Sequence, residues 1–217
     1  MVRKVLSKNG EPRQQVKGDT WKEKLGKFLV KHLSRKKRYY PISPAELEPV
    51  STINVPETKI KLVASQVFVR NVGKKAILKI GYVSEDFRDW FLGKTEDPLA
   101  KQTLYYYKLL EPSGNGPIVA KLGGEEKAET TLTEIYGLMA KQANGCRGPL
   151  ITNNWWNIFF VRDQKGVLRV VHLCWYDDGW YVYARAVNFP ASWYAGHMVF
   201  SRNSVPKPQG SLVPVEV

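Results

Sequence analysis

The chain has 217 residues, of which 43% are hydrophobic and 12% aromatic, and its formal net charge is +13. This composition excludes a wholly disordered protein, and the length allows one domain with extensions or two small domains. Its two cysteines, Cys146 and Cys174, are too few for a disulfide framework and lack C-x-x-C spacing. Because the sequence also lacks a signal-peptide pattern and an apolar run of about 18 residues, it predicts a soluble cytoplasmic protein.

The positive charge is concentrated near the N-terminus. Residues 1–40 hold thirteen Lys and Arg against three acidic residues, a net charge of +10, whereas the other 177 residues carry only +3. Thr20 and Glu23 have the spacing of a capping box. The residues that follow place apolar side chains on one helix face and lysines on another. We therefore expect a basic arm that contains an amphipathic helix from Thr20 to Ser34.

Four prolines follow the basic residues, at positions 41, 44, 49 and 56. Proline removes a backbone donor and interrupts helices and central strands. We therefore expect an irregular strap here, with regular structure starting near residue 58. The predicted organisation is a basic arm, amphipathic helix and proline-rich strap at 1–57, a globular domain at 58–203 and a flexible tail at 204–217.

The first half of the globular domain is rich in strand signals. Segments 59–70 and 75–83 are rich in β-branched residues, and they predict a hairpin that turns at the glycine between them. Ser84 and Gly93 are placed to start and stop a short helix. A second strand pair, "TLYYYKLLE" with "PIVAKL", is predicted around the turn-rich "PSGNG".

The second half predicts one helix and then a meander. Thr131 and Glu134 repeat the capping-box spacing, and Asn144-Gly145 supplies a stop, so a helix is expected to lie on the sheet. "WWNIFFVR", "VLRVVHLCWY", "WYVYARAV" and "MVFSR" predict three or four antiparallel strands. The expected fold class is α+β, with a mostly antiparallel sheet, one or two packed helices, a C-terminal β-meander and a basic N-terminal helical arm.

The series "FVRD", "GVLR", "WYDDGW" and "VFSRN" within residues 155–203 resembles a C-terminal segment of a set of uncharacterised bacterial proteins. The resemblance implies a bacterial protein. It implies no activity, cofactor or catalytic residue.

The basic arm is the strongest functional signal in the sequence. Clustered cations gain affinity for nucleic acid by releasing the counterions that are condensed on its phosphates. A solvated tail, an anionic membrane surface and a protein partner remain open as alternatives for the same residues. The predicted nucleic-acid contacts are Lys22, Lys24, Lys27, Lys31, Arg35, Lys36, Lys37 and Arg38, with Tyr39 and Tyr40 stacking on bases or docking the strap.

Five of the seven tryptophans lie between Trp155 and Trp193. Exposed rings there would stack on bases or sugars, whereas buried rings belong to the core, which is the commoner role. In each adjacent pair, such as Trp155 and Trp156, alternation along a strand directs one ring away from the core.

His172 and Cys174 share a strand face, and with Cys146 or His197 they would offer a zinc site or a thiol nucleophile. Their spacing matches no ligand motif, so packed side chains are the preferred interpretation and no metal or cofactor is expected. The sequence therefore favours a non-catalytic binding protein that contacts nucleic acid through its arm. One alternative is a protein- or glycan-interaction module whose arm binds a membrane or a partner. The other is an enzyme, which would need a cleft that gathers His172, Cys174 and a carboxylate.

Overall fold

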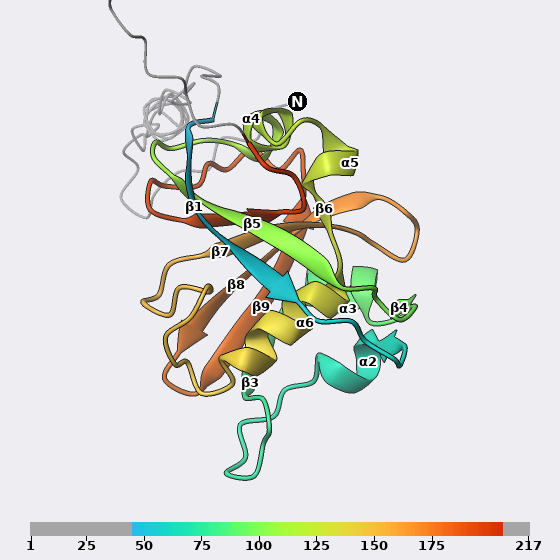
Figure 1. Ribbon diagram of the computed structural model, residues 1–217. Coiled ribbons are helices and arrows are strands. Elements are labelled where there is room, and N and C mark those ends of the chain that lie inside the picture. The colour runs from blue at the N-terminus through green and yellow to red at the C-terminus, as the bar shows by residue number, and fades with distance from the viewer. Residues whose placement is uncertain (1–44, 206–217) are drawn as a thin grey trace, which may run out of the picture. The chain divides into compact units, whose positions relative to one another are not determined.

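The computed structural model describes residues 45–205, and these form an α+β fold with a mixed, mostly antiparallel sheet and five helices (Figure 1). None of these five helices has the length and apolarity needed to cross a membrane. The strands are β1 (Leu47–Val55), β2 (Leu62–Val63), β3 (Ile80–Val83), β4 (Thr95–Glu96), β5 (Gln102–Leu109), β6 (Glu129–Thr130), β7 (Asn157–Arg162), β8 (Leu168–Tyr176), β9 (Gly179–Ala186) and β10 (Met198–Ser201). The helices are α2 (Ala64–Val67), α3 (Glu85–Phe91), α4 (Asn115–Lys121), α5 (Glu125–Ala128) and α6 (Leu132–Lys141).

The main sheet has the strand order β1-β5-β10-β7-β8-β9-β3. Neighbouring strands are antiparallel except for two parallel pairs, β10 with β7 and β3 with β9. One edge of β7 pairs with β8, so the other edge carries both β10 and the short parallel strand β6. Strands β2 and β4 form a separate two-stranded sheet.

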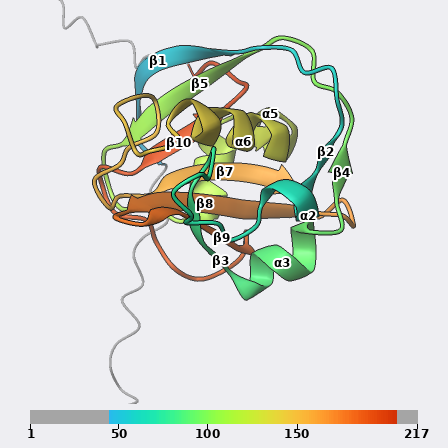
Figure 2. The ribbon, with the colours of Figure 1, turned by 90° about the horizontal axis from the view of Figure 1, so that it is seen from below.

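The sheet curves around α6, with β1 and β5 on one side of the helix and β7, β8 and β9 on the other (Figure 2). A buried apolar cluster fills this space and includes Leu104, Leu138, Phe159 and Trp180. A second buried cluster brings α4 and α5 together with β1, β5, β7, β8 and β10. Because residues alternate along a strand, Ile158 belongs to the second cluster whereas its neighbour Phe159 belongs to the first.

The two capping signals that fall within the described residues were confirmed. The Ser84 hydroxyl accepts a hydrogen bond from the backbone N–H of Phe87 and starts α3. Thr131 and Glu134 form a complete capping box at the start of α6. In both helices the cap satisfies backbone N–H groups that have no partner inside the helix.

The prediction that prolines keep residues 41–57 irregular was wrong for β1, which pairs antiparallel with β5 at one edge of the sheet. Pro49 is tolerated because an edge strand leaves backbone donors unpaired, and the register shifts between Pro49 and Ser51. The domain therefore holds regular structure before residue 58.

Two predicted strand pairs were also wrong. Of the predicted hairpin, the described residues keep one antiparallel bridge, between Asn71 and Ile80. Residues 59–70 contain β2 and α2, and β3 pairs in parallel with β9 far along the chain. The segment "PIVAKL" belongs to helix α4, because its first turn tolerates a proline and its apolar residues recur at helical spacing. Ile118 and Leu122 accordingly face the second cluster.

The C-terminal meander was confirmed for β7, β8 and β9, which pair antiparallel in chain order. The fourth segment, β10, does not extend the meander and lies between β5 and β7. The predicted arm helix and all but the first two residues of the predicted tail lie outside the described residues.

Candidate binding face

Four tyrosines gather on the face of β8, β9 and β3 that lies away from α6: Tyr82, Tyr176, Tyr181 and Tyr183. We call them the tyrosine platform. Tyr181 and Tyr183 are two residues apart on β9 and share a face of the sheet. The alternating residues Trp180 and Val182 belong to the core around α6. The ring of Tyr82 on β3 stacks on that of Tyr181, with centroids 5.8 Å apart. The Tyr176 ring, at the end of β8, meets Tyr181 edge to face at 4.6 Å.

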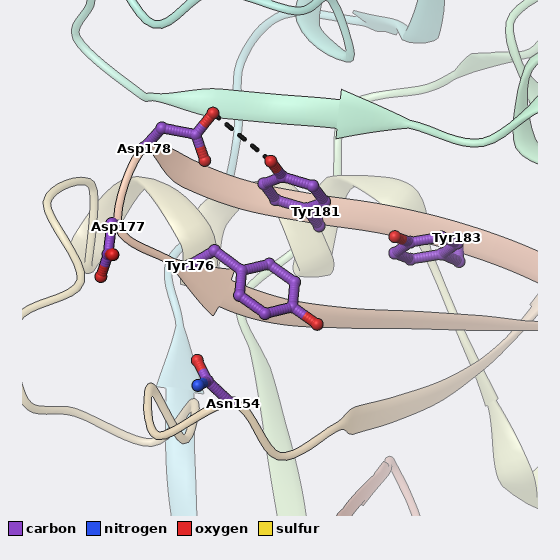
Figure 3. Close-up of a pocket in the computed structure, with 6 residues that line it drawn as sticks. All are labelled: Asn154, Tyr176, Asp177, Asp178, Tyr181 and Tyr183. Atoms are coloured by element: carbon purple, nitrogen blue, oxygen red, sulfur yellow. Dashed lines mark hydrogen bonds between the residues drawn. The ribbon is translucent and has the colours of Figure 1, made fainter.

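Beside the platform lies a hollow of about 450 Å³. This volume is within the range of small-molecule sites, which is roughly 300–1,000 Å³. Figure 3 shows the rings of Tyr176, Tyr181 and Tyr183 beside β8 and β9, with the Asp178 carboxylate directed toward Tyr181. The hollow is lined by Asn154, Tyr176, Asp177, Asp178, Tyr181 and Tyr183.

The β8–β9 turn places the acidic groups next to the tyrosines. Asp177 and Asp178 form the turn, and β9 begins at Gly179 with a φ of 146°. A Cβ at Gly179 would lie 2.8 Å from the backbone oxygen of Lys79, so only glycine allows this turn to approach the segment that leads into β3. The close approach brings Tyr82 alongside Tyr181.

The hydroxyls of Tyr181 and Tyr183 remain protonated at neutral pH, because both have a raised pKa. The Tyr181 hydroxyl donates a hydrogen bond of 3.4 Å to Oδ2 of Asp178. Desolvation, followed by the Asp178 carboxylate, raises the pKa of Tyr181 above its ordinary value. Burial raises the pKa of Tyr183 to about 12. These groups are therefore hydrogen-bond donors and acceptors, and the carboxylates of the hollow are acceptors for ligand hydroxyls.

The structure separates the groups that the enzyme alternative would need. His172 and Cys174 are both buried on β8, and neither lines the hollow that contains Asp177 and Asp178. Burial raises the pKa of Cys174 to about 12, so its sulfur is held as the thiol. Cys146 is exposed and donates to the backbone oxygen of Lys141. Within residues 45–205, no three His, Cys, Asp or Glu side chains are grouped so as to hold a metal ion.

Trp155 and Trp156, which precede β7, differ in burial as the sequence predicted. Trp155 is 39% exposed, whereas its neighbour Trp156 packs against the second cluster. Trp180 and Trp193 are buried. Most of the aromatic segment is therefore core, and the tyrosines of the same strands, which sequence reasoning did not select, form the accessible aromatic face. The signal was present as "YVY" on β9, where tyrosines two apart share a face.

The residues predicted to contact nucleic acid, positions 22–40, lie outside the described part of the chain. Comparison with protein families, with curated proteins and with solved structures gave no match. The resemblance of residues 155–203 to a bacterial segment therefore stays a prediction.

Proposed function

We propose that this is a non-catalytic binding protein whose domain binds a glycan on the tyrosine platform. The observation that carries the proposal is that one exposed and two half-buried tyrosines, two carboxylates and an amide line one hollow. The apolar face of a sugar ring packs on an aromatic ring, while its hydroxyls donate to carboxylates. Tyr176 is 37% exposed and Tyr82 38% exposed, so their rings are open to a ligand.

The charge of the hollow favours a sugar over a nucleobase as the ligand of the platform. Bases also stack on aromatic rings, but each base carries a phosphate along the same strand. Asp177 and Asp178 would repel that phosphate, whereas they accept hydrogen bonds from neutral hydroxyls. A neutral or weakly charged oligosaccharide therefore fits the platform better than single-stranded nucleic acid.

The test is saturation-transfer NMR of the intact protein with neutral oligosaccharides built from glucose, galactose, mannose and N-acetylglucosamine, followed by titration of any binder. Tyr181→Ala should weaken binding about tenfold or more, because it removes a stacking ring. Asp178→Asn should weaken binding through the lost acceptor. Tyr194→Ala is the matched control, because Tyr194 is 67% exposed and does not line the hollow.

Loss of binding in Tyr181→Ala and Asp178→Asn, with the control unchanged and circular dichroism spectra preserved, would support the proposal. Equal affinity in all three variants would place the sugar elsewhere. If no sugar in the panel transfers saturation to the protein, the glycan proposal is wrong.

A second candidate function belongs to the basic arm, as a nucleic-acid clamp. The observation that favours it is the net charge of +10 within residues 1–40, against +3 in the remaining 177 residues. Binding of this kind depends on phosphate neutralisation, so its affinity falls steeply with salt. It is compatible with a glycan site on the domain, because the two use different residues.

Fluorescence anisotropy with single- and double-stranded oligonucleotides, at rising salt, tests the clamp. The proper variant replaces the eight basic residues of positions 22–38 by glutamine, since deletion of residues 1–57 would also remove β1 from the sheet. Affinity at low salt should fall at least about a hundredfold, because several phosphate contacts are lost. Unchanged affinity would assign binding to another surface.

A further inference from the structure

A cluster of two buried histidines and a half-buried arginine lies on the same face of β8 and β9 as the platform, and we call it the arginine cluster. It consists of Arg185 on β9, His172 on β8, and Trp193 and His197 from the segment between β9 and β10. The guanidinium carbon of Arg185 lies 3.5 Å from the centre of the Trp193 ring. The Trp193 ring in turn meets His172 at 5.0 Å and His197 at 5.6 Å.

The guanidinium is stacked through its face, and this leaves its edges for hydrogen bonding. Nε and Nη2 of Arg185 are both shielded from solvent, and neither has a hydrogen-bond partner among residues 45–205. These two nitrogens belong to one edge of the guanidinium, the edge that donates two parallel hydrogen bonds to a carboxylate or phosphate. Arg185 also forms no ion pair with any carboxylate that the structure describes.

The two histidines repeat the pattern. Nδ1 of His172 and Nδ1 of His197 are buried, and within the described chain neither nitrogen has a hydrogen-bond partner. His172 is 9% exposed and His197 4% exposed, so both imidazoles lie almost wholly inside the protein. Four shielded nitrogens without a partner thus belong to three side chains that contact the same Trp193 ring, and the desolvated charge of a guanidinium is ordinarily paired.

The pKa values of the cluster are those of groups near a positive charge with no negative charge to offset it. Burial, followed by the Arg185 charge, lowers the pKa of His172 to about 3 and that of His197 to about 4. Burial also lowers the pKa of Arg185 to about 10. An anion would offset each of these effects, because it stabilises the charged form of every group around it.

We propose that Arg185, His172 and His197 form a binding site for an oxyanion group, a carboxylate or a phosphate, with the Nε and Nη2 edge of Arg185 as its principal donor pair. Trp193 fixes the guanidinium plane by stacking on it. The proposal does not depend on the glycan site, because none of these residues lines the hollow. The Tyr183 ring joins the two regions, since it stacks on His172 at 5.4 Å and also lines the hollow.

The experiment is thermal unfolding of the intact protein at pH 7 and constant ionic strength, with sodium chloride replaced in part by sodium phosphate or sodium acetate. A ligand that binds only the folded state raises the midpoint, by about 3–6 °C for each tenfold excess over its Kd. We expect this rise in phosphate or in acetate relative to chloride. A larger rise in phosphate identifies a phosphate group, and a larger rise in acetate identifies a carboxylate.

Three variants show whether the rise comes from this cluster. Arg185→Met should abolish it, and Arg185→Lys should reduce it, because lysine keeps the charge but loses the paired donors. Arg147→Met, at an exposed arginine outside the cluster, should leave the rise unchanged. A rise caused by anions bound to the basic arm would persist in all three variants. An equal rise in the wild type, Arg185→Met and Arg147→Met would overturn the proposal.

Nuclear magnetic resonance tests the same site in the wild type, so its result does not depend on whether a variant folds. The Nε–H resonance of Arg185 should shift and exchange more slowly as inorganic phosphate or acetate is added. No anion-dependent change at Arg185, together with equal midpoints in chloride, phosphate and acetate, would show that the site does not bind an oxyanion, and water would then be its occupant.

Discussion

Glu96 and Thr133 are joined by two hydrogen bonds to the same carboxylate oxygen, from the Thr133 backbone N–H at 2.8 Å and from its hydroxyl at 2.7 Å. The other oxygen of Glu96 accepts from the backbone N–H of Leu132 and lies 3.0 Å from the Lys94 ammonium. A buried carboxylate from β4 thus completes the cap of α6, the helix that the sheet surrounds.

Glu96→Ala should therefore lower the free energy of unfolding by about 3 kcal/mol, because it removes a buried acceptor and leaves Lys94 without its ion-pair partner, with only the Arg162 carbonyl to accept from it. Urea unfolding at pH 7 measures the loss. Asp97→Asn is the control, since its ion pair with Lys61 is exposed and should contribute less than about 1 kcal/mol. Equal effects of the two substitutions would mean that the cap is unimportant.

Asp163 should stabilise the β7–β8 turn in a pH-dependent way. Burial opposes ionisation of Asp163, but hydrogen bonds from Arg169 and from the backbone of Val167 and Lys165 outweigh it, so its pKa lies below the ordinary value. A lowered carboxyl pKa gives stability that is present above about pH 4 and is lost as the pH falls through the folded-state pKa.

Asp163→Asn should accordingly cost about 2 kcal/mol at pH 7 and progressively less below about pH 4. Chemical unfolding at pH 7, 4 and 2.5 measures this difference. Asp177→Asn, at an exposed turn position, is the control and should change the free energy of unfolding at pH 7 by less than about 0.5 kcal/mol.

The neutral histidines predict acid sensitivity at a higher pH. His172 and His197 have folded-state pKa values of about 3 and about 4, well below 6.5. The unfolded chain therefore binds up to two more protons between about pH 6.5 and 5. Stability should fall in this window as the pH falls, by up to about 2.7 kcal/mol per pH unit.

Urea unfolding from pH 7.5 to 5 tests this slope in the wild type and in His172→Gln. The variant should retain about half of the slope, because one of the two buried imidazoles is gone. An unchanged slope would show that His172 titrates normally in the folded protein.

The two cysteines should differ sharply in reactivity. Cys146 is exposed, whereas Cys174 is buried and its raised pKa holds it as the thiol. A thiol reagent at pH 8 should modify one cysteine rapidly and the second only after unfolding, because the thiolate is the reactive form. Cys146→Ser should remove the rapid phase, and rapid modification of two groups in the folded wild type would contradict this placement.

Local signals in the sequence predicted the elements that depend on neighbouring residues. The caps at Ser84 and Thr131 are made within four residues, so both helices could be read from the chain. The strands β7, β8 and β9 could equally be predicted from the sequence, because short turns join them. The failures were β1, the pairing of β3 and the helical state of α4, which depend on partners far away in the sequence.

Only part of the candidate site could be predicted from the sequence, for the same reason. Sequence reasoning selected His172, Cys174 and the tryptophans by residue type, and the structure divides them between core and surface. The arginine cluster forms because the chain after β9 returns to place Trp193 and His197 over β8 and β9. No pattern along the sequence encodes that return.

The position of β10 has a consequence for how the protein is made. Residues 198–201 lie between β5 and β7, so they join one part of the sheet, β1 and β5, to the part built from β7, β8, β9 and β3. A nascent chain on the ribosome can form hairpins and helices earlier, but it cannot unite these parts until Ser201 has emerged. Translation arrested before that point should leave two sheet fragments with open edges, which are targets for chaperones and proteases.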